Sequence, residues 1–140
     1  MPINAYLNFE GNTREVVLFY AEVFGLGEPQ LITFGSMPAH PDYPLPPGTE
    51  DWVMHARLMI DGSALMFSDV FPGMPYNPGN NFTLSYVTKD EDALKSAFHK
   101  LKEGGTTVME LQETDWSKCY GQVTDKFGIG WQFNLAGEQD

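Results

Sequence analysis

The feature that most constrains this chain is an internal repeat. An extended apolar segment followed by a helical pattern occurs twice, in NAYLNFEGNTREVVLFYAEVFG and in FTLSYVTKDEDALKSAFHKLKEGG. Residues of similar character lie 78 positions apart in the two copies: Phe9 and Val87, Asn12 and Asp90, Val16 and Leu94, Tyr20 and Phe98, Val23 and Leu101. Such a constant spacing predicts that the chain is built from two copies of one structural unit.

Each copy contains the start, the stripe and the end of an amphipathic helix. Asn12 followed by Glu15 forms a capping pattern for the first helix, Gly25 can end it, and Asp90 is the expected cap of the second. The apolar stripes follow the helical period, with Val16, Phe19, Tyr20 and Val23 in the first helix and Leu94, Ala97, Phe98 and Leu101 in the second. We therefore expect each helix to pack one face against a sheet.

Three strand-like segments follow each helix. They are EPQLITFG, WVMHARLMI and SALMFSDV in the first copy, and TTVMELQ, CYGQVTD and IGWQFNL in the second. The dipeptide Asp61-Gly62 predicts a two-residue type I′ hairpin. Gly62 corresponds to Gly128, 66 positions later, and the decrease from 78 to 66 matches a proline-rich insertion over residues 37–48, MPAHPDYPLPPG. This loop could be a lid or a subunit contact, and the sequence leaves both open.

These patterns predict one α+β domain over residues 1–140. Two β-α-β-β-β modules, at about 1–71 and about 79–136, form a curved, partly closed barrel with helices outside. The content of 42% hydrophobic and 14% aromatic residues is sufficient for a sizeable core.

The charge and the cysteine content restrict the partners. A net charge of −11 argues against nucleic acid or an anionic membrane as the partner, so we expect a small-molecule ligand. The single Cys119 cannot form an internal disulfide, the N-terminus lacks a signal-peptide pattern, and the apolar segment 16–24 is too short to span a membrane. A cytoplasmic location follows by default.

Strand alternation and the hairpin register predict which side chains line the concave sheet face. The hairpin pairs Ile60 with Ser63 and Arg57 with Met66, and paired residues share a face. With the 78-residue offset applied to the first strand of each module, the expected ligand-binding set is Tyr6, Asn8, Met59, Met66, Ser68, Phe82, Tyr86 and Gln132. Apolar surface with a few polar anchors is typical of a small-molecule pocket.

His55 and Arg57 are the candidate catalytic residues on that face. His55 would act as general acid or base, and Arg57 would hold an anion. The alternative for His55 is a histidine hydrogen-bonded within the sheet or at a subunit contact. Cys119 follows Lys118, which favours a nucleophile, but a lone strand cysteine is more often an inert filler. Tyr6, Tyr86, Trp116 and Tyr120 are candidates for stacking on a flat ligand or for core packing.

The paired modules and the segments YLNFEGN, MHARLMIDG and WSKCYGQVTDKFGIGWQFN resemble the vicinal oxygen chelate superfamily of glyoxalases, extradiol dioxygenases and bleomycin-resistance proteins. The similarity is greatest to its PhnB-like branch, often described as 3-demethylubiquinone methyltransferase-like. The resemblance implies a homodimer. It also implies metal ligands at Asn4, Phe82, Met66 and Gln132, which are not the histidine and glutamate that metal-using members have there.

The usual description of this branch names a methyltransferase. However, the strand-to-helix junction NFEGNTRE has one glycine, whereas S-adenosylmethionine sites are glycine-rich at this junction. We therefore expect no metal and no cofactor. The leading hypothesis is a protein that binds a small molecule, as the bleomycin-resistance members do. The alternatives are an enzyme of the lyase, dioxygenase or isomerase type that uses His55 and Arg57, with or without a metal, and a dimeric interaction module.

Overall fold

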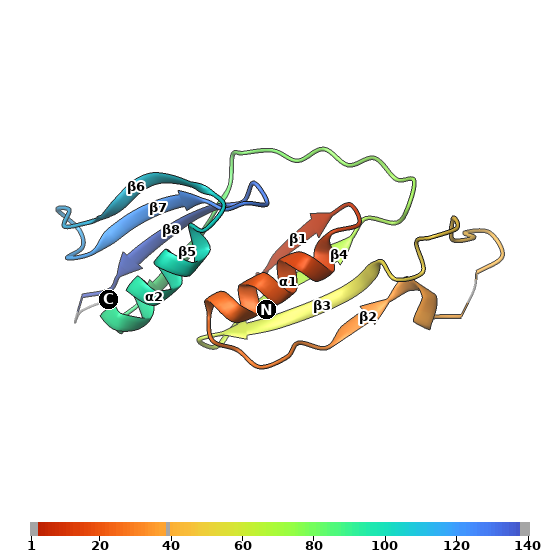
Figure 1. The fold of residues 1–140 in the computed structure, drawn as a ribbon, viewed down its shortest axis with the longest axis horizontal. Helices are drawn as coiled ribbons and strands as arrows, with labels where there is room; N and C mark the ends of the chain where they lie inside the picture. Colours follow the sequence, from red (N-terminus) through yellow and green to blue (C-terminus); the bar gives the residue numbers. More distant parts are fainter. Residues whose placement is uncertain (1–2, 39, 138–140) are drawn as a thin grey trace. The chain divides into compact units, whose positions relative to one another are not determined.

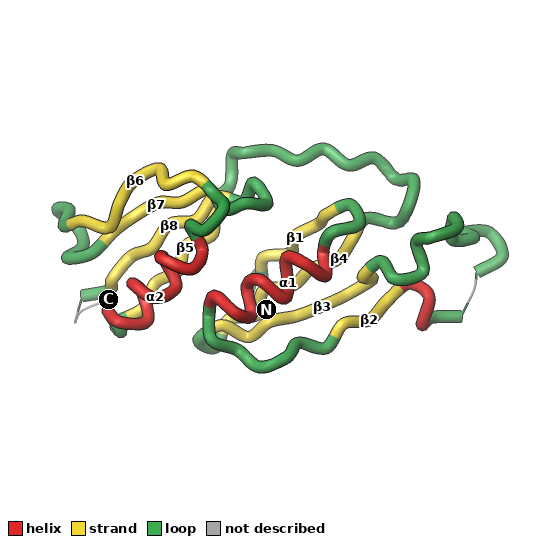
Figure 2. The backbone as a smooth tube through the Cα atoms, viewed as in Figure 1, coloured by secondary structure: helices red, strands yellow, loops and turns green. Residues whose placement is uncertain are grey.

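The structure is a computed structural model that describes residues 3–38 and 40–137. The chain divides into two compact units, Met1–Asn77 and Pro78–Asp140, and each is described by itself (Figures 1 and 2). No helix in the described part of the chain is long and apolar enough to cross a membrane.

The first unit is a four-stranded sheet with one long helix. Its elements are β1 (Ala5–Phe9), α1 (Thr13–Val23), β2 (Leu31–Thr33), a short 3₁₀ helix η1 (Phe34–Ser36), β3 (Val53–Ile60) and β4 (Ser63–Asp69). The strand order is β1-β4-β3-β2. β1 runs parallel to β4 because α1 returns the chain to the start of the sheet, whereas the other pairs are antiparallel.

The second unit repeats this topology. Its elements are β5 (Thr83–Thr88), α2 (Glu91–Leu101), β6 (Thr106–Gln112), β7 (Tyr120–Thr124) and β8 (Gly130–Leu135), and its strand order is β5-β8-β7-β6. The expected α+β class and the two β-α-β-β-β modules are confirmed. Each sheet is open, with two edge strands, and its helix covers one face (Figure 1).

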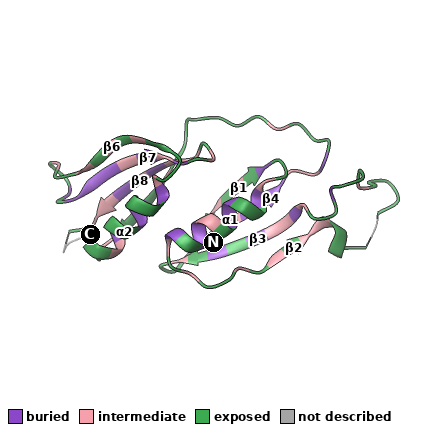
Figure 3. Ribbon diagram, in the orientation of Figure 1, coloured by how far each residue is buried: buried purple, intermediate pink, exposed green. Residues whose placement is uncertain are grey.

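The helical stripes form the two cores. In α1 the buried residues include Val16, Tyr20 and Val23, and the Tyr20 ring lies 5.8 Å from that of Phe67 in β4. In α2 the whole expected stripe is buried: Leu94, Ala97, Phe98 and Leu101. In Figure 3, buried and exposed residues alternate along the helices and strands. Because burial of one large apolar side chain contributes roughly 1.5–3 kcal/mol, these stripes supply much of each module's stability.

The two helices begin differently. Asp90 accepts a hydrogen bond from the backbone N–H of Ala93 at 3.0 Å, as expected of an N-cap. Asn12 occupies the N-cap position of α1, but its side chain makes no capping hydrogen bond. The predicted start of α1 at Asn12 is therefore confirmed, but the capping hydrogen bond expected of its side chain is wrong. The carboxylate of Asp69, at the end of β4, accepts from the Thr13 N–H instead.

The hairpin between β3 and β4 has the predicted turn and register. Asp61 and Gly62 have φ angles of 48° and 86°, both in the left-handed region that a type I′ turn requires. Ile60 pairs with Ser63 and Arg57 with Met66. The faces assigned to β3 and β4 follow from this register.

The face assigned to Tyr86 is wrong. Tyr86 pairs with Phe133 in β8, is buried, and meets the Phe133 ring at 6.0 Å on the side that α2 covers. The β5 residues on the open side are Thr83, Ser85 and Val87, because these pair with Gly130, Gln132 and Asn134.

The error has a simple physical cause. The β1–α1 connection has three residues, 10–12, whereas the β5–α2 connection has two, 89–90. The helices therefore align at an offset of 78, but the preceding strands align at 79. Because side chains alternate along a strand, a shift of one residue places each of them on the opposite face.

Candidate functional site

The open face of the first sheet, opposite α1, carries large side chains that remain exposed. Tyr6 from β1, Ile32 from β2 and Met59 from β3 are 42%, 43% and 47% exposed. They lie there because β-strand alternation directs every second residue away from the helix. Such a concentration of exposed apolar surface on one sheet face is typical of a binding surface.

Tyr6 and His55 are in direct contact on this face. The Tyr6 hydroxyl lies 3.1 Å from Nδ1 of His55, and the two ring centroids are 5.9 Å apart. β1 and β3 both flank β4, so this contact passes over the middle strand, where Met66 pairs with Tyr6 on one side and Arg57 on the other. The three strands therefore bring a phenol, an imidazole, a guanidinium and a thioether together.

Arg57 and Asn8 supply polar groups beside this contact. Among the described residues, no acidic side chain forms an ion pair with Arg57, which is exposed. Asn8 is exposed as well, and its side-chain oxygen accepts a hydrogen bond of 3.3 Å from the buried Ser68 hydroxyl. An exposed guanidinium without a carboxylate partner is suited to hold an anionic group of a ligand.

The open face of the second sheet carries a hydrogen-bond network centred on Gln132. Its carbonyl oxygen accepts from the Tyr120 hydroxyl at 2.6 Å, and its amide donates to the Thr83 hydroxyl at 2.8 Å. Gln122 donates to the same Tyr120 oxygen at 3.0 Å. Both ends of the Gln132 amide are thus engaged within the module. Phe82, the other predicted residue of this module, immediately precedes β5 and is 83% exposed.

The residues at the superfamily's metal-ligand positions do not fit a divalent ion. Met66 offers a soft thioether, and the neutral amide of Gln132 is held by Tyr120 and Thr83. With the corrected offset of 79, the position equivalent to Asn4 is Thr83 rather than Phe82, and a hydroxyl is a weak ligand. In residues 3–38 and 40–137 no three His, Cys, Asp or Glu side chains gather in a way that would hold a metal ion.

The β1–α1 junction likewise does not fit S-adenosylmethionine. In nucleotide-binding folds the free N–H groups at this junction face the ligand. Here the N–H groups of Gly11 and Thr13 donate to Oδ1 of the buried Asp69, at 2.7 and 3.1 Å. The donors that a cofactor would need are used to hold the helix to the sheet.

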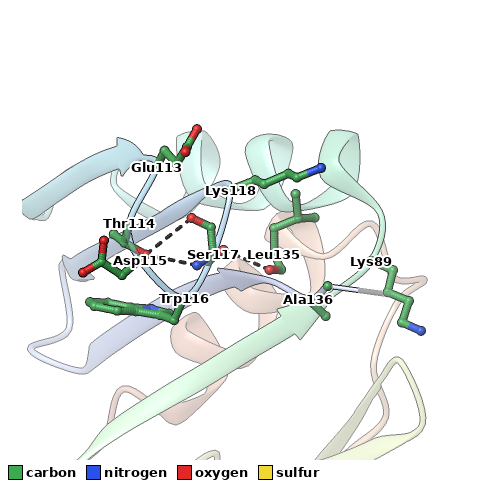
Figure 4. Close-up of a pocket in the computed structure, with 10 residues that line it drawn as sticks. Lys89, Glu113, Thr114, Asp115, Trp116, Ser117, Lys118, Leu135 and Ala136 are labelled. Carbon is green, nitrogen blue, oxygen red and sulfur yellow. Dashed lines mark hydrogen bonds between the residues drawn. The ribbon is translucent and has the colours of Figure 1, made fainter. Parts of the chain in front are cut away.

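A surface cavity of about 630 Å³ lies beside the β6–β7 connection of the second module (Figure 4). Charged residues of both signs line it, together with Trp116, whose ring meets that of Tyr120 edge-on at 5.2 Å. Ser117 donates to the Leu135 carbonyl at 2.9 Å and fixes the loop. The neighbouring Cys119 is buried, and burial raises the pKa of its thiol, which opposes a role as nucleophile.

The structure also shows site residues that sequence reasoning missed. Ile32 pairs with His55 and extends the open face onto β2. Alternation in the segment EPQLITFG would have indicated its direction, but the short strand offers too few residues to fix the register. Thr83 was missed because the offset of 78 placed Phe82 at its position.

Comparison with known proteins agrees with this architecture. A family model described as 3-demethylubiquinone-9 3-methyltransferase matches residues 2–134. Protein YjdN of Escherichia coli K12 is 32% identical over an alignment of 145 positions, gaps included, that covers 99% of this chain and 98% of that protein. The crystal structure of protein PA1353 from Pseudomonas aeruginosa is 34% identical, with a TM-score of 0.82 and coverage of 96% of both chains.

Two further solved structures connect the chain to a branch and to a fold. A Bacillus cereus protein described as a putative 3-demethylubiquinone-9 3-methyltransferase, PhnB protein, is 29% identical, with a TM-score of 0.71 and coverage of 97% of this chain and 100% of that chain. A glyoxylase/bleomycin resistance protein/dioxygenase domain from Frankia is 14% identical with a TM-score of 0.63, covers 98% of both chains, and shows the fold alone. The chain therefore belongs to the PhnB-like 3-demethylubiquinone-9 3-methyltransferase family and has the fold of the glyoxylase/bleomycin resistance/dioxygenase domains.

Proposed function

We propose that this protein binds a small, partly apolar molecule with an anionic group on the open face of the first sheet, without a divalent ion at the superfamily's positions. The observation that carries the proposal is the group formed by Tyr6, His55, Arg57, Met59 and Met66 on one exposed face. Tyr6, Met59 and Met66 supply apolar contact area, and Arg57 supplies the charge. Asn8 and Ser68 add polar contacts at the edge of this set.

The residues predicted for the second sheet contribute less to this proposal, and one of them, Phe82, precedes β5 at a position that does not correspond to Asn4. Gln132 and Phe82 remain candidates for ligand contact, Gln132 through hydrogen bonds and Phe82 through its exposed ring. Tyr86 is withdrawn because its ring is part of the core beneath α2.

Ligand screening tests the proposal. A set of small carboxylates, phosphates and neutral aromatic compounds is titrated while the thermal midpoint and the methionine methyl NMR signals are recorded. A ligand of the folded form raises the midpoint, and binding at this face shifts the signals of Met59 and Met66. Arg57→Gln should weaken the binding of anionic ligands about tenfold, since a charge-assisted hydrogen bond contributes about 1.5 kcal/mol or more. Lys95→Gln, on α2, is the control.

Shifts at other methionines only, or equal affinity of the wild type and Arg57→Gln for every ligand, would contradict the proposed site. Elemental analysis tests the metal-free part. About one transition metal per chain, whose removal by a chelator abolishes ligand binding, would overturn it.

The contact between Tyr6 and His55 favours a metal-free enzyme as a second candidate. In the neutral tautomer that donates from Nδ1 of His55 to the Tyr6 oxygen, Nε2 carries no proton and can accept one from a bound molecule, while Arg57 holds the resulting anion. Turnover lost in His55→Ala with ligand affinity retained would support this reading. Turnover unchanged in that variant would exclude His55 as the base.

The homodimer expected from the family is a proposal of the same kind. Exposed Tyr6, Ile32 and Met59 would also suit a subunit contact, in which case the open face would serve assembly. Solution mass combined with the ligand screen separates the two uses. A dimer that dissociates on Met59→Glu and binds none of the screened compounds would favour the interaction module.

A further inference from the structure

The proline-rich connection between β2 and β3, drawn in orange to yellow in Figure 1, borders a cavity of about 900 Å³ within the first module. Four aromatic rings line it, from Phe34, His40, Tyr43 and Phe71. None of the residues of the open face, from Tyr6 to Met66, belongs to its lining. This cavity is therefore a separate feature of the module, lined largely by described residues of the proline-rich connection.

Two of the ring pairs stand at steep angles, and the third, His40 with Tyr43, is tilted by 46°. Phe71 meets Phe34 at 5.6 Å with an interplanar angle of 89°, and it meets Tyr43 at 6.3 Å with an angle of 77°. His40 lies 5.1 Å from Tyr43. In an edge-to-face pair the edge of one ring meets the face of the other, and this leaves ring surface that can contact a third group. Several aromatic faces around one space attract a positive charge through their quadrupoles.

The charges near the cavity have the sign that such a ligand requires. Among the described lining residues Glu50 is the one carboxylate, and no Lys or Arg lines the cavity. The sequence contains no Lys or Arg between Arg14 and Arg57, while it places Asp42, Glu50 and Asp51 in that stretch. Nδ1 of His40 accepts a hydrogen bond of 3.1 Å from the Asp42 N–H.

We propose that this cavity binds a small organic ammonium ion, with its alkyl groups against Phe34, Tyr43 and Phe71 and its charge balanced by Glu50. An anion is disfavoured by Glu50 and by the net charge of −11. A neutral apolar ligand would find the same rings but would gain nothing from the carboxylate. The charge of the ligand is therefore the property to test.

The probes are choline and its neutral isostere 3,3-dimethyl-1-butanol, in which a tert-butyl group replaces trimethylammonium. They are titrated into the full-length protein labelled with ¹³C at the methionine methyl groups. Met37 and Met54 line the cavity, whereas Met59 and Met66 lie on the β3 and β4 strands of the open face, so the signals report the two places separately. We expect choline to shift the Met37 and Met54 signals at lower concentration than the isostere.

Two substitutions with a control complete the test. Glu50→Gln and Tyr43→Ala should each raise the Kd of choline about three- to tenfold, the range that cation–π and partly exposed charge contacts contribute. Both residues are exposed, so the fold should persist, which the unchanged spectrum of the other methionines checks. Glu28→Gln, outside the cavity, should leave the Kd unchanged.

The proposal would be overturned by equal Kd values for choline and the isostere, by shifts confined to Met59 and Met66, or by the absence of a saturable shift with choline. Loss of affinity in Glu28→Gln equal to that in Glu50→Gln would also overturn it, because the effect would then reflect net charge alone.

Discussion

The two modules share one topology but use their buried carboxylates in different places. In the first module Asp69 closes the end of β4 and accepts from Gly11, Thr13 and Val53, so that it ties the start of α1 and the start of β3 to the sheet. In the second module Asp125 lies in the β7–β8 turn and accepts from backbone N–H groups of that turn and from the Trp131 indole. The apolar layer is repeated between the modules, whereas the polar anchors are not.

The open faces differ in the same manner. The pairings place Gln122 where the first module has Arg57, and Gln132 where it has Met66. The second module uses these amides in hydrogen bonds with Tyr120 and Thr83, while no acidic side chain of the described residues pairs with Arg57 in the first. The Gln122 and Gln132 amides of the second module are therefore engaged within their own sheet, although Oδ1 of the neighbouring Asn134 is buried without a hydrogen-bond partner in the part of the chain that the structure describes, whereas Arg57 of the first module stays exposed.

Among the substitutions that test this difference between the modules, removal of the Asp69 carboxylate should lower the free energy of unfolding the most. Asp69 is 2% exposed and accepts four hydrogen bonds. In Asp69→Ala these buried donors lose their acceptor, so we expect the free energy of unfolding to fall by about 3 kcal/mol or more, measured by urea denaturation. Asp115→Ala, an exposed carboxylate, is the control. A loss below about 1 kcal/mol would mean that water replaces the carboxylate.

Substitution of the small residue beneath α2 should have the next largest effect on the free energy of unfolding. Gly121 pairs with Phe133 as Ala56 pairs with Phe67. A Cβ at Gly121 would lie 2.8 Å from the Phe98 ring and 3.0 Å from the Met109 carbonyl. Gly121→Ala should therefore destabilise the protein by about 1–3 kcal/mol.

The matched control for this exchange is Gly27→Ala, because a Cβ at Gly27 meets nothing within 4 Å. We expect a change within about 0.5 kcal/mol there. Equal changes in stability at Gly121 and Gly27 would show that α2 moves to accommodate the added methyl group without a cost in free energy. The core beneath α2 would then not be closely packed.

Substitution of Gln132 should have a smaller effect that sharpens the difference between the open faces. Gln132→Leu removes the hydrogen bonds to Tyr120 and Thr83 and should cost about 1 kcal/mol in urea denaturation. Gln132→Glu should cost less, because the Thr83 hydroxyl can rotate and donate to the carboxylate. A larger loss of unfolding free energy in Gln132→Glu than in Gln132→Leu would contradict the hydrogen-bond network around Gln132.

Alkylation of Cys119 should show the smallest effect of all. Burial raises the pKa of this thiol, so the folded state favours the thiol over the thiolate. The contribution of this thiol to the free energy of unfolding is fully present below the pKa that it has in the unfolded chain, and it is lost as the pH rises through the pKa that it has in the folded state. Stability at neutral pH is therefore unaffected. Iodoacetamide should modify the native protein far more slowly than the urea-unfolded chain. Equal rates would show that Cys119 is accessible in the second module.

Local patterns predicted most of the fold. The Asp61-Gly62 turn, the β3–β4 register and the α2 stripe depend on neighbouring residues, and they are confirmed. The α1 stripe is confirmed at Val16, Tyr20 and Val23, whereas Phe19 is only partly buried. The β5 face was mispredicted because both its strand and its helix match the first copy, and only the length of the connection between them differs. Nothing in the pattern of apolar residues records a missing loop residue.

By itself the sequence determined the repeated β-α-β-β-β unit, because hydrophobic periodicity and turn chemistry act over a few residues. It also determined that His55, Arg57, Met59 and Met66 share one face, because a two-residue turn fixes the register. Only the tertiary structure decided that Tyr6 reaches His55 across β4, that Asp69 rather than Asn12 caps α1, and that the insertion gathers four rings around one cavity. These contacts join residues far apart in the chain, and their partners are chosen by strand pairing and packing, which no local pattern contains.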